Sequence, residues 1–344
     1  MTYTYLGIDM AARTFSASTW AAGETRRLGS FANTPAGFAA CAQALPAGVD
    51  AAPLWLIVEP TGGYEHGLLT FALEQGWRIS LPNPRQVRAW IKGQGVRAKT
   101  DPIDADHLAA FGAQRQPKEW HPLPATVQPL DNLLRRRADL EASRRQELNR
   151  QASAQRQRGV DPAVRLTYTV LLSALETALA AIDAALQAHL AQHPALQAQV
   201  KLLLTVPGVG AKTVLRLLVL LTRWQALTDG QGLAKGLVAF VGLDPQTAES
   251  GTSLHGPGLI SRMGDKHVRQ WLYMSALGGK RGRNPLRDFF ERLVGRGKAK
   301  KLALVACMRK ILIWAWAVFR QQVPFDPAKA ARRPPRPAPV LLPA

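Results

Sequence analysis

Four carboxylates in the first third of the chain stand where an acidic side chain suits catalysis better than folding. Asp9 ends the apolar run 6–8, and Glu59 ends the apolar run 56–58. Asp101 and Asp104 lie one helical turn apart at the start of a predicted helix. A carboxylate at the end of a buried strand is costly unless a positive partner compensates it, and a neighbouring carboxylate adds to the cost. Mg²⁺, which favours carboxylate oxygens, is the partner that this set predicts.

Each of these acids also has a structural interpretation. Asp9 taken alone fits a turn-capping aspartate as well as a catalytic one. Glu65 is the rival of Glu59 in the same segment, but we expect Glu65 in the first turn of a helix, where a carboxylate favours the helix dipole. Asp106 is displaced around its helix from Asp104, and we expect it to face solvent.

A candidate nucleophile lies in the last third of the chain. Ser250 precedes Gly251, which leaves the hydroxyl sterically open in a loop flanked by basic residues. Such a serine can attack phosphorus, while the neighbouring cations stabilise the developing charge. Ser253 is the alternative nucleophile, and a Ser-Gly pair is also typical of a plain turn.

The charge of the chain indicates its partners. Its 44 Lys and Arg residues exceed its 24 Asp and Glu residues, which gives a net charge of +20. This excess favours a polyanion, DNA or RNA, with an anionic membrane surface as the competing interpretation. We expect no membrane partner, because the N-terminus has no leader pattern and the most apolar stretches carry charges or are short. Cys41 and Cys307 have no second Cys or His at metal-ligand spacing, so we predict a reduced cytosolic compartment.

Two glycine-rich or basic segments predict contacts to nucleic acid. Segment 202–213 looks like the hairpin of a helix-hairpin-helix element, which presents backbone N–H groups to a phosphate; an ordinary helix connection is the alternative. Segment 298–310 predicts an amphipathic helix with a basic face, for which simple solvation is the alternative. The predicted contact residues are Arg97, Lys99, Gly208, Gly210, Lys212, Arg262, Lys266, Arg269, Lys298, Arg309 and Lys310.

The predicted elements place these residues in four regions. Three strands followed by alternating helix and strand predict an RNase H-like α/β domain with a mixed sheet over residues 1–115. Residues 116–200 predict two long helices interrupted at Asp161-Pro162, a helical hairpin or coiled coil that suits oligomerisation, or else solvated helices packed on their own domain. Residues 201–323 predict a mainly helical domain, and the basic, proline-rich residues 324–344 predict disorder.

The motifs taken together resemble the DEDD insertion-sequence transposases over residues 3–320. In the N-terminal half the resemblance rests on Gly-Ile-Asp, Glu-Pro-Thr-Gly-Gly-Tyr-Glu and Lys-Thr-Asp-Pro-Ile-Asp-Ala. In the C-terminal half it rests on Val-Pro-Gly-Val-Gly, Val-Gly-Leu-Asp-Pro, Ser-Gly, Asn-Pro and the segment 306–312. Several motifs in the family's order are far more specific than any one of them.

This resemblance implies a fold, a mechanism and partners. It implies a RuvC-like domain and a serine-bearing transposase domain. The family's acidic tetrad carries over onto Asp9, Glu59, Asp101 and Asp104, and its serine onto Ser250. Magnesium, with a two-metal site as one arrangement, would serve recombination of donor and target double-stranded DNA through a phosphoserine link. The resemblance also implies a bridge RNA, a bacterial cytosol or nucleoid, and an oligomer from dimer to tetramer in which the RuvC-like domain of one protomer meets the serine of another.

Two other functions fit part of the sequence. A structure-selective endonuclease of the Holliday-junction-resolvase type would use the same carboxylates with water as the attacking group. A non-catalytic nucleic-acid-binding protein would need only the basic charge, and it leaves the acids at the strand ends unexplained.

Overall fold

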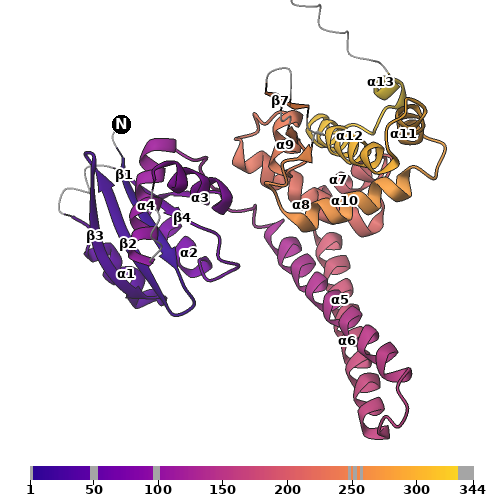
Figure 1. Cartoon of the computed structure of the whole chain (residues 1–344), viewed down its shortest axis with the longest axis horizontal. Helices are drawn as coiled ribbons and strands as arrows, with labels where there is room; N and C mark the ends of the chain where they lie inside the picture. The colour runs from indigo at the N-terminus through magenta and orange to yellow at the C-terminus, as the bar shows by residue number, and fades with distance from the viewer. Residues whose placement is uncertain are drawn as a thin grey trace, which may run out of the picture. The chain divides into compact units, whose positions relative to one another are not determined.

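The computed structural model describes residues 3–46, 53–95, 101–246, 249–250, 254–255 and 259–331. For residues 101–103, 249–250, 254–255 and 331 it describes the backbone alone. Arg97, Lys99 and Ser253, three of the residues singled out above, lie outside the described residues. The chain forms two compact units, residues 1–122 with 226–230 and residues 123–225 with 231–344 (Figure 1). The finer four-part division stays a prediction.

A five-stranded mixed sheet forms the centre of the first unit. The strands are β1 (Thr4–Met10), β2 (Thr14–Ala21), β3 (Glu24–Ala32), β4 (Leu54–Val58) and β5 (Arg78–Ser80). Their order in the sheet is β3-β2-β1-β4-β5. The first three strands form an antiparallel meander, and β4 and β5 continue the sheet in parallel with β1. The predicted mixed α/β sheet is therefore present, and it fits an RNase H-like domain.

Two pairs of helices cover the two faces of this sheet. The helices are α1 (Pro35–Gln43), α2 (His66–Glu74), α3 (Pro84–Gly93) and α4 (Asp101–Arg115). Leu6 and Ile8 of β1 belong to the apolar core that includes Phe38 of α1 and residues of α2. Tyr5 of β1 belongs instead to a second core with Leu108 of α4 and residues of α3. Because side chains alternate along a strand, the odd-numbered residues of β1 face the α3 and α4 side.

Helix α4 lies against the sheet with almost no space between the two backbones. A Cβ atom at Gly7 of β1 would lie 2.2 Å from the carbonyl oxygen of Ala105 and 2.3 Å from the amide nitrogen of Ala109. A Cβ atom at Gly112 would lie 2.5 Å from a side-chain carbon of Ile57 and 2.9 Å from one of Tyr5. Residue numbers therefore rise along α4 as they fall along β1, so α4 begins at the carboxyl end of β1.

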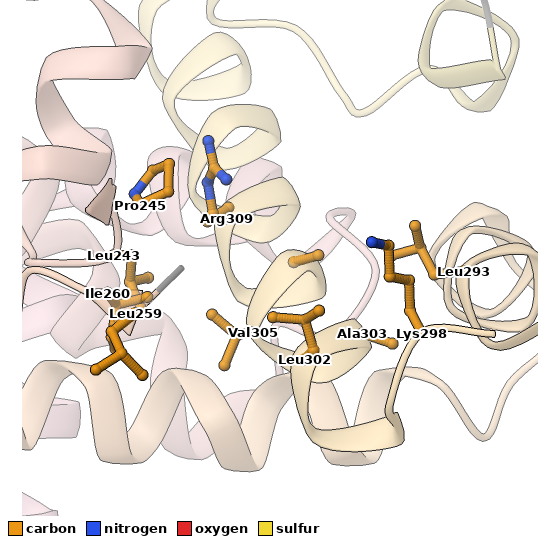
Figure 2. Close-up of a pocket in the computed structure, with 11 residues that line it drawn as sticks. Leu243, Pro245, Leu259, Ile260, Leu293, Lys298, Leu302, Ala303, Val305 and Arg309 are labelled. Carbon is orange, nitrogen blue, oxygen red and sulfur yellow. The ribbon is translucent and has the colours of Figure 1, made fainter. Parts of the chain in front are cut away.

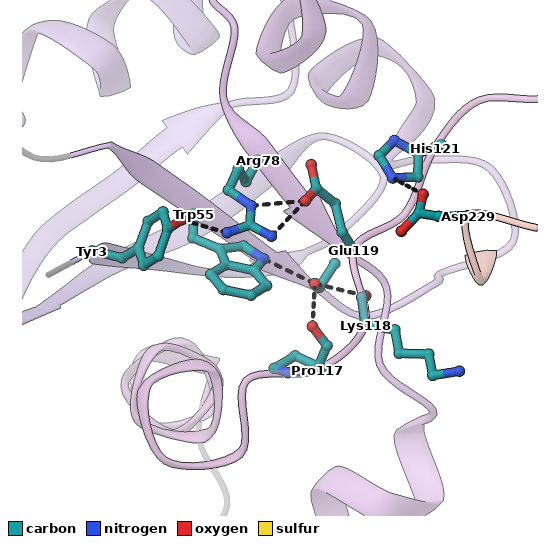
Figure 3. Close-up of polar contacts among 9 residues, drawn as sticks. Tyr3, Trp55, Arg78, Pro117, Lys118, Glu119, His121 and Asp229 are labelled. Carbon is teal, nitrogen blue, oxygen red and sulfur yellow. Dashed lines mark hydrogen bonds and ion pairs between the residues drawn. The ribbon is translucent and has the colours of Figure 1, made fainter. Parts of the chain in front are cut away.

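The segment that follows α4 is fixed along β5. The hydroxyl of Ser80 lies 3.0 and 2.8 Å from the carbonyl oxygens of Pro117 and Lys118, and it accepts a hydrogen bond of 2.9 Å from the indole of Trp55 (Figure 3). Arg78 pairs with Glu119 at 2.6 Å, and its guanidinium carbon lies 4.1 Å from the centre of the Trp55 ring. These contacts hold residues 117–119 against β5, after which the chain leaves the sheet.

The second unit begins with a hairpin of two long helices, α5 (Gln128–Gln155) and α6 (Pro162–Gln192). Ion pairs join them at two levels: Arg137 with Asp183 at 2.6 Å, and Arg144 with Glu176 at 3.0 Å. Figure 1 shows the two helices side by side over most of their length. The predicted helical hairpin is therefore present; coiled-coil packing and a role in oligomerisation stay predictions.

The rest of the second unit is mainly helical, as predicted. Its helices are α7 (Pro194–Leu204), α8 (Ala211–Leu227), α9 (Ala234–Phe240), α10 (Lys266–Gly279), α11 (Pro285–Gly295), α12 (Lys300–Gln321) and α13 (Pro327–Ala331). Two short ribbons pair β6 (Pro245–Gln246) with β9 (Leu259–Ile260), and β7 (Glu249–Ser250) with β8 (Leu254–His255). Helix α12 is central, because it packs on α7, α9, α10 and α11.

Two described helices, α6 and α12, are long and apolar enough to cross a membrane by length and composition. This is weak evidence, since the core helix of a soluble protein passes the same test. Most of the apolar stretch of α12 is buried within its own unit, and little of that of α6 is.

Replacing Gly7 with Ala should destabilise the first unit, because the added methyl group meets backbone atoms of α4 that cannot rotate away. We expect the free energy of unfolding, measured in urea, to fall by about 3 kcal/mol. Gly93→Ala is the matched control, because its Cβ atom would meet nothing within 4 Å. Equal stability of the two variants would contradict the packing described for α4.

Candidate active site

Asp9 and Glu59 leave neighbouring strands at the same edge and toward the same face of the sheet. Strands β1 and β4 are parallel, and Ile8 is the register partner of Val58. The next residue on each strand is the candidate acid, so the two backbones lie about 5 Å apart. By alternation Asp9 shares the face of Gly7, and Glu59 shares the face of Ile57, which is the face that α4 covers. Both acids are half-buried.

Helix α4 begins at this edge and carries the other two predicted acids. Asp104 is half-buried and lies one turn before Leu108, on the helical stripe that packs toward β1 and β4. Asp101 is the first residue of α4, and its side chain lies outside the described part of the chain. The fold thus brings Asp9, Glu59 and the first turn of α4 to one edge of the sheet.

Asp106 does not face solvent, which corrects the expectation from helical spacing. Its carboxylate accepts a hydrogen bond of 2.6 Å from the Ser18 hydroxyl and pairs with Arg27 at 2.7 Å. Only 19% of its side chain is exposed. Because α4 crosses β2 and β3 as well as β1, the side of the helix that carries Asp106 also meets the sheet. Asp106 therefore fixes the rotation of α4 about its axis. The sequence did not indicate Arg27 as the partner of Asp106.

Glu65 has a structural role, but it precedes α2 instead of lying in its first turn, and its carboxylate folds the loop that follows Glu59. The buried carboxylate accepts hydrogen bonds from the Thr61 amide at 3.2 Å, the Thr61 hydroxyl at 2.7 Å and the Gly63 amide at 3.0 Å. Burial alone would raise the pKa of Glu65, but these hydrogen bonds outweigh burial and lower its pKa. Gly62 and Gly63 have φ of +85° and +131°, a backbone that other residues rarely adopt.

The described side chains do not by themselves form a metal site. Among them, no three His, Cys, Asp or Glu residues lie close enough together to hold a metal ion. Cys41 and Cys307 are buried free thiols, and burial raises the pKa of Cys41 to about 12 and that of Cys307 to about 11. Neither thiol is a ready nucleophile at neutral pH. Metal binding by the four acids stays a prediction.

Ser250 is carried by a ribbon whose base is tightly packed. Ser250 pairs with Leu254 across the β7–β8 ribbon, and its side chain lies outside the described part of the chain. Below the ribbon, a Cβ atom at Gly242 would lie 2.7 Å from the amide nitrogen of Gly264, so the backbones of the two segments touch. Arg269 ties them together, because its guanidinium donates to the carbonyls of Val241 at 3.0 Å and Gly264 at 2.6 Å.

The predicted basic contacts fall into two groups in the structure. Exposed residues are Gly210, Lys212, Arg262, Lys266 and Lys298. Arg269 is instead used in the internal hydrogen bonds above. Gly208, with φ of +91°, packs inward, because a Cβ atom there would lie 2.9 Å from Ile311 and 3.0 Å from the carbonyl oxygen of Ser275. In the loop between α7 and α8, Gly208 thus packs inward and Gly210 is open. The helix-hairpin-helix geometry of this segment stays a prediction.

Lys298 and Arg309 lie on a mostly apolar pocket of about 210 Å³ in the second unit (Figure 2). Its walls come from α11, α12 and the β6–β9 ribbon with the residues beside it, and they include Leu243, Ile260 and Leu302. Lys310, the remaining predicted contact, packs over the rings of Phe289 and Trp314. Burial, together with nearby Arg292, lowers the pKa of Lys310.

Sequence reasoning missed two features that position candidate residues. Asn33 donates from one amide nitrogen to the carbonyls of Ala11 at 3.2 Å and Tyr64 at 3.1 Å, which joins the segments after Asp9 and Glu59. Arg281 and Arg283 are exposed in the α10–α11 loop, beside the α7–α8 loop, because a Cβ atom at Gly279 would lie 2.6 Å from Gly208 Cα. The basic run at 280–283 was a signal for the second feature; nothing in the sequence indicates the first.

Replacing Glu65 with Gln should destabilise the first unit in a pH-dependent way. The lowered pKa of Glu65 means that its carboxylate contributes stability above the pKa of the unfolded chain and loses it as the pH falls through the folded pKa. We expect a loss of about 2 kcal/mol near neutral pH, shrinking toward acid, in urea unfolding. Glu74→Gln, at an exposed position, is the control. A loss that is the same at all pH values would contradict the assigned role.

Comparison with known proteins agrees with this architecture. A family model described as "Transposase", of the DEDD type found in IS110, matches residues 6–157, and the model of the IS116/IS110/IS902 transposases matches residues 200–291. The chain is 33% identical over 330 residues to the "Pilin gene-inverting protein" of Moraxella bovis, which covers 95% of this chain and 98% of that protein. The protein of the same name from Moraxella lacunata matches equally, at 33% over 330 residues, with the same coverage of both chains. An uncharacterized 43.6 kDa protein of insertion element IS110 from Streptomyces coelicolor is 30% identical over 151 residues, 43% of this chain and 35% of that protein. The chain therefore belongs to the IS110 family of DEDD transposases.

Proposed function

We propose that this transposase cuts and exchanges double-stranded DNA with Asp9, Glu59, Asp101 and Asp104 as the ligands of Mg²⁺ and Ser250 as the nucleophile. The observation that carries the proposal is the convergence of three elements: the ends of β1 and β4 and the first turn of α4. A metal-dependent phosphoryl-transfer site would account for an acid on each of these three elements.

The chemistry of the donor set supports magnesium. Asp9, Glu59 and Asp104 supply carboxylate oxygens, which are the ligands that Mg²⁺ prefers, and four carboxylates are enough for one or two ions. When bound, the metal would offset phosphate charge and lower the barrier for attack at phosphorus.

The serine supplies a covalent intermediate. Ser250 Oγ forms a bond to phosphorus while the bond between phosphorus and one deoxyribose oxygen breaks, and the released DNA end takes up the proton as a hydroxyl group. The phosphate ester to Ser250 keeps the number of phosphodiester-type bonds unchanged, so a second DNA hydroxyl can reverse the step on a new strand. The acids belong to the first unit and Ser250 to the second, which agrees with the family pattern in which two protomers share one active site.

The remaining partners follow from family membership and charge. The net charge of +20 favours DNA together with a structured bridge RNA, and the exposed cations of the second unit offer contacts to phosphates. The α5–α6 hairpin, with exposed Leu166 and Val170 on α6, suits association into a dimer or tetramer. The names of the two Moraxella relatives describe inversion of a gene, a recombination of DNA, and we propose the same class of reaction here. The bacterial cytosol or nucleoid is the proposed compartment.

A metal-dependent endonuclease that uses water instead of serine is the second candidate function. It is favoured by the same convergence of acids, and it differs by leaving no bond between protein and DNA. The first experiment below tests the acids that both functions need, and the second separates the two functions.

Conservative replacement of the acids should abolish DNA cleavage without unfolding the protein. We expect Asp9→Asn, Glu59→Gln and Asp104→Asn each to lower the rate of cleavage, followed on denaturing gels, by roughly 100-fold or more, because each removes a charged oxygen from the proposed metal. Glu74→Gln, on an exposed helix end, should cleave normally. Cleavage at the wild-type rate in the three acid variants would rule out these acids as the metal site.

Replacing Ser250 with Ala should abolish the covalent protein–DNA adduct, whereas Ser253→Ala should retain it. The measurement is the labelled DNA that stays attached to protein after denaturation and is released by a phosphodiesterase. If Ser250→Ala still forms the adduct, Ser250 is not the nucleophile. If the wild-type protein cleaves without any adduct, the water-dependent endonuclease is the better description.

A further inference from the structure

Tyr64 is an exposed aromatic side chain in a unit whose other rings are packed. Its exposed fraction is 53%, and the only other aromatic residue among the exposed large hydrophobic residues of the described chain is Phe240, at 36%. The other aromatic rings of the first unit stack on one another, for example Tyr5 on Trp55 and Phe15 on Phe31. Within the described residues the Tyr64 ring takes part in no such pair. Its ring is therefore not part of the core.

The backbone that carries Tyr64 is fixed from three sides. The Glu65 carboxylate holds the amides of Thr61 and Gly63, at 3.2 and 3.0 Å. The Gly63 carbonyl accepts a hydrogen bond of 3.2 Å from the His66 amide, which begins α2. The Tyr64 carbonyl accepts the hydrogen bond of 3.1 Å from Asn33. A ring that is exposed on such a rigid loop loses little conformational entropy on binding.

The same contacts place Tyr64 at the edge where the acids converge. Asn33 donates to the carbonyls of both Tyr64 and Ala11, so these two backbone groups lie within hydrogen-bond reach of one nitrogen atom. Ala11 is two residues beyond Asp9, and Tyr64 is five residues beyond Glu59. The backbone that carries this exposed ring is thus held at the same edge of the sheet as the two strand ends with the candidate metal ligands.

We propose that the Tyr64 ring stacks on a nucleobase of the DNA strand that the acidic edge cuts, next to the scissile phosphate. This inference rests on the proposed function, because it takes the strand at that edge to be DNA. Nucleobases are flat and apolar on their faces, and an exposed ring on a fixed loop can stack on any of the four. The acids and metal would hold the phosphate, and the ring would hold the adjacent base, so that the strand cannot slide past the site.

The test is photocrosslinking with a short single-stranded oligodeoxythymidine in which iododeoxyuridine replaces one thymidine. This base crosslinks to an aromatic ring on which it stacks. We expect irradiation of the full-length protein to label Tyr64, as mapped by mass spectrometry. Tyr64→Phe should keep the crosslink and the affinity for the oligonucleotide, because the ring remains. Tyr64→Leu, which keeps apolar bulk without a ring, should lose the crosslink and weaken binding about tenfold.

Controls separate this inference from its alternatives. Leu73→Ala, at the other exposed large apolar residue in the described part of the first unit, should change neither the crosslink nor the affinity. Equal affinity in Tyr64→Leu and the wild type would overturn the stacking role. Loss of DNA cleavage in Tyr64→Phe with unchanged binding would also overturn it, in favour of a role for the hydroxyl.

Cleavage by Glu59→Gln, measured in parallel, keeps the two proposals distinguishable. If Glu59→Gln loses cleavage but no crosslink forms at Tyr64 in the wild type, the stacking role fails and the metal site stands. If Tyr64 crosslinks but Glu59→Gln cleaves normally, the metal site fails, and the Tyr64 ring stacks on a base that is not next to the scissile phosphate.

Discussion

The backbone contact between α4 and β1 is the constraint on which the candidate active site depends. Gly7 on the strand removes the side chain that would separate the two elements, and Gly112 on the helix makes room for Ile57 and Tyr5. Asp106, held by Ser18 and Arg27, then fixes the rotation of the helix. With position and rotation both set, the start of α4 has to lie where β1 and β4 end. The convergence of the three elements that carry the candidate acids is a consequence of this packing.

The second unit uses glycine in the same way to bring loops together. Gly208 and Gly279 bring the α7–α8 and α10–α11 loops into backbone contact, and Gly242 and Gly264 do so for the segments below the serine ribbon. Arg269 completes the second of these contacts with two hydrogen bonds to carbonyl groups. Glycines of the Val-Pro-Gly and Val-Gly-Leu motifs therefore have packing roles that local sequence does not reveal. In both units, glycines of the short sequence motifs stand where two backbone segments touch.

Much of the fold could be predicted because its signals are local. The apolar runs of β1 and β4 and the Asp161-Pro162 interruption before α6 are short-range patterns, and the elements lie where these patterns indicate. The roles of individual charges were harder to predict, because they depend on partners far away in the chain. Asp106 was expected in solvent, yet its partners are 88 and 79 residues away. Arg269 was expected at a phosphate, yet one of its carbonyl partners is 28 residues away. The four candidate acids could be proposed from the sequence because their positions at strand and helix ends are themselves local features.

The most direct test of the central claim is the binding of a divalent cation at the shared edge, measured by calorimetric titration of the DNA-bound protein with Mn²⁺. The account predicts that the wild type binds Mn²⁺ and that Glu59→Gln and Asp104→Asn each weaken this binding at least about tenfold, although one residue belongs to the sheet and the other to α4. Glu74→Gln should bind as the wild type does. Unchanged Mn²⁺ affinity in both acid variants would contradict the claim that this packing builds one metal site.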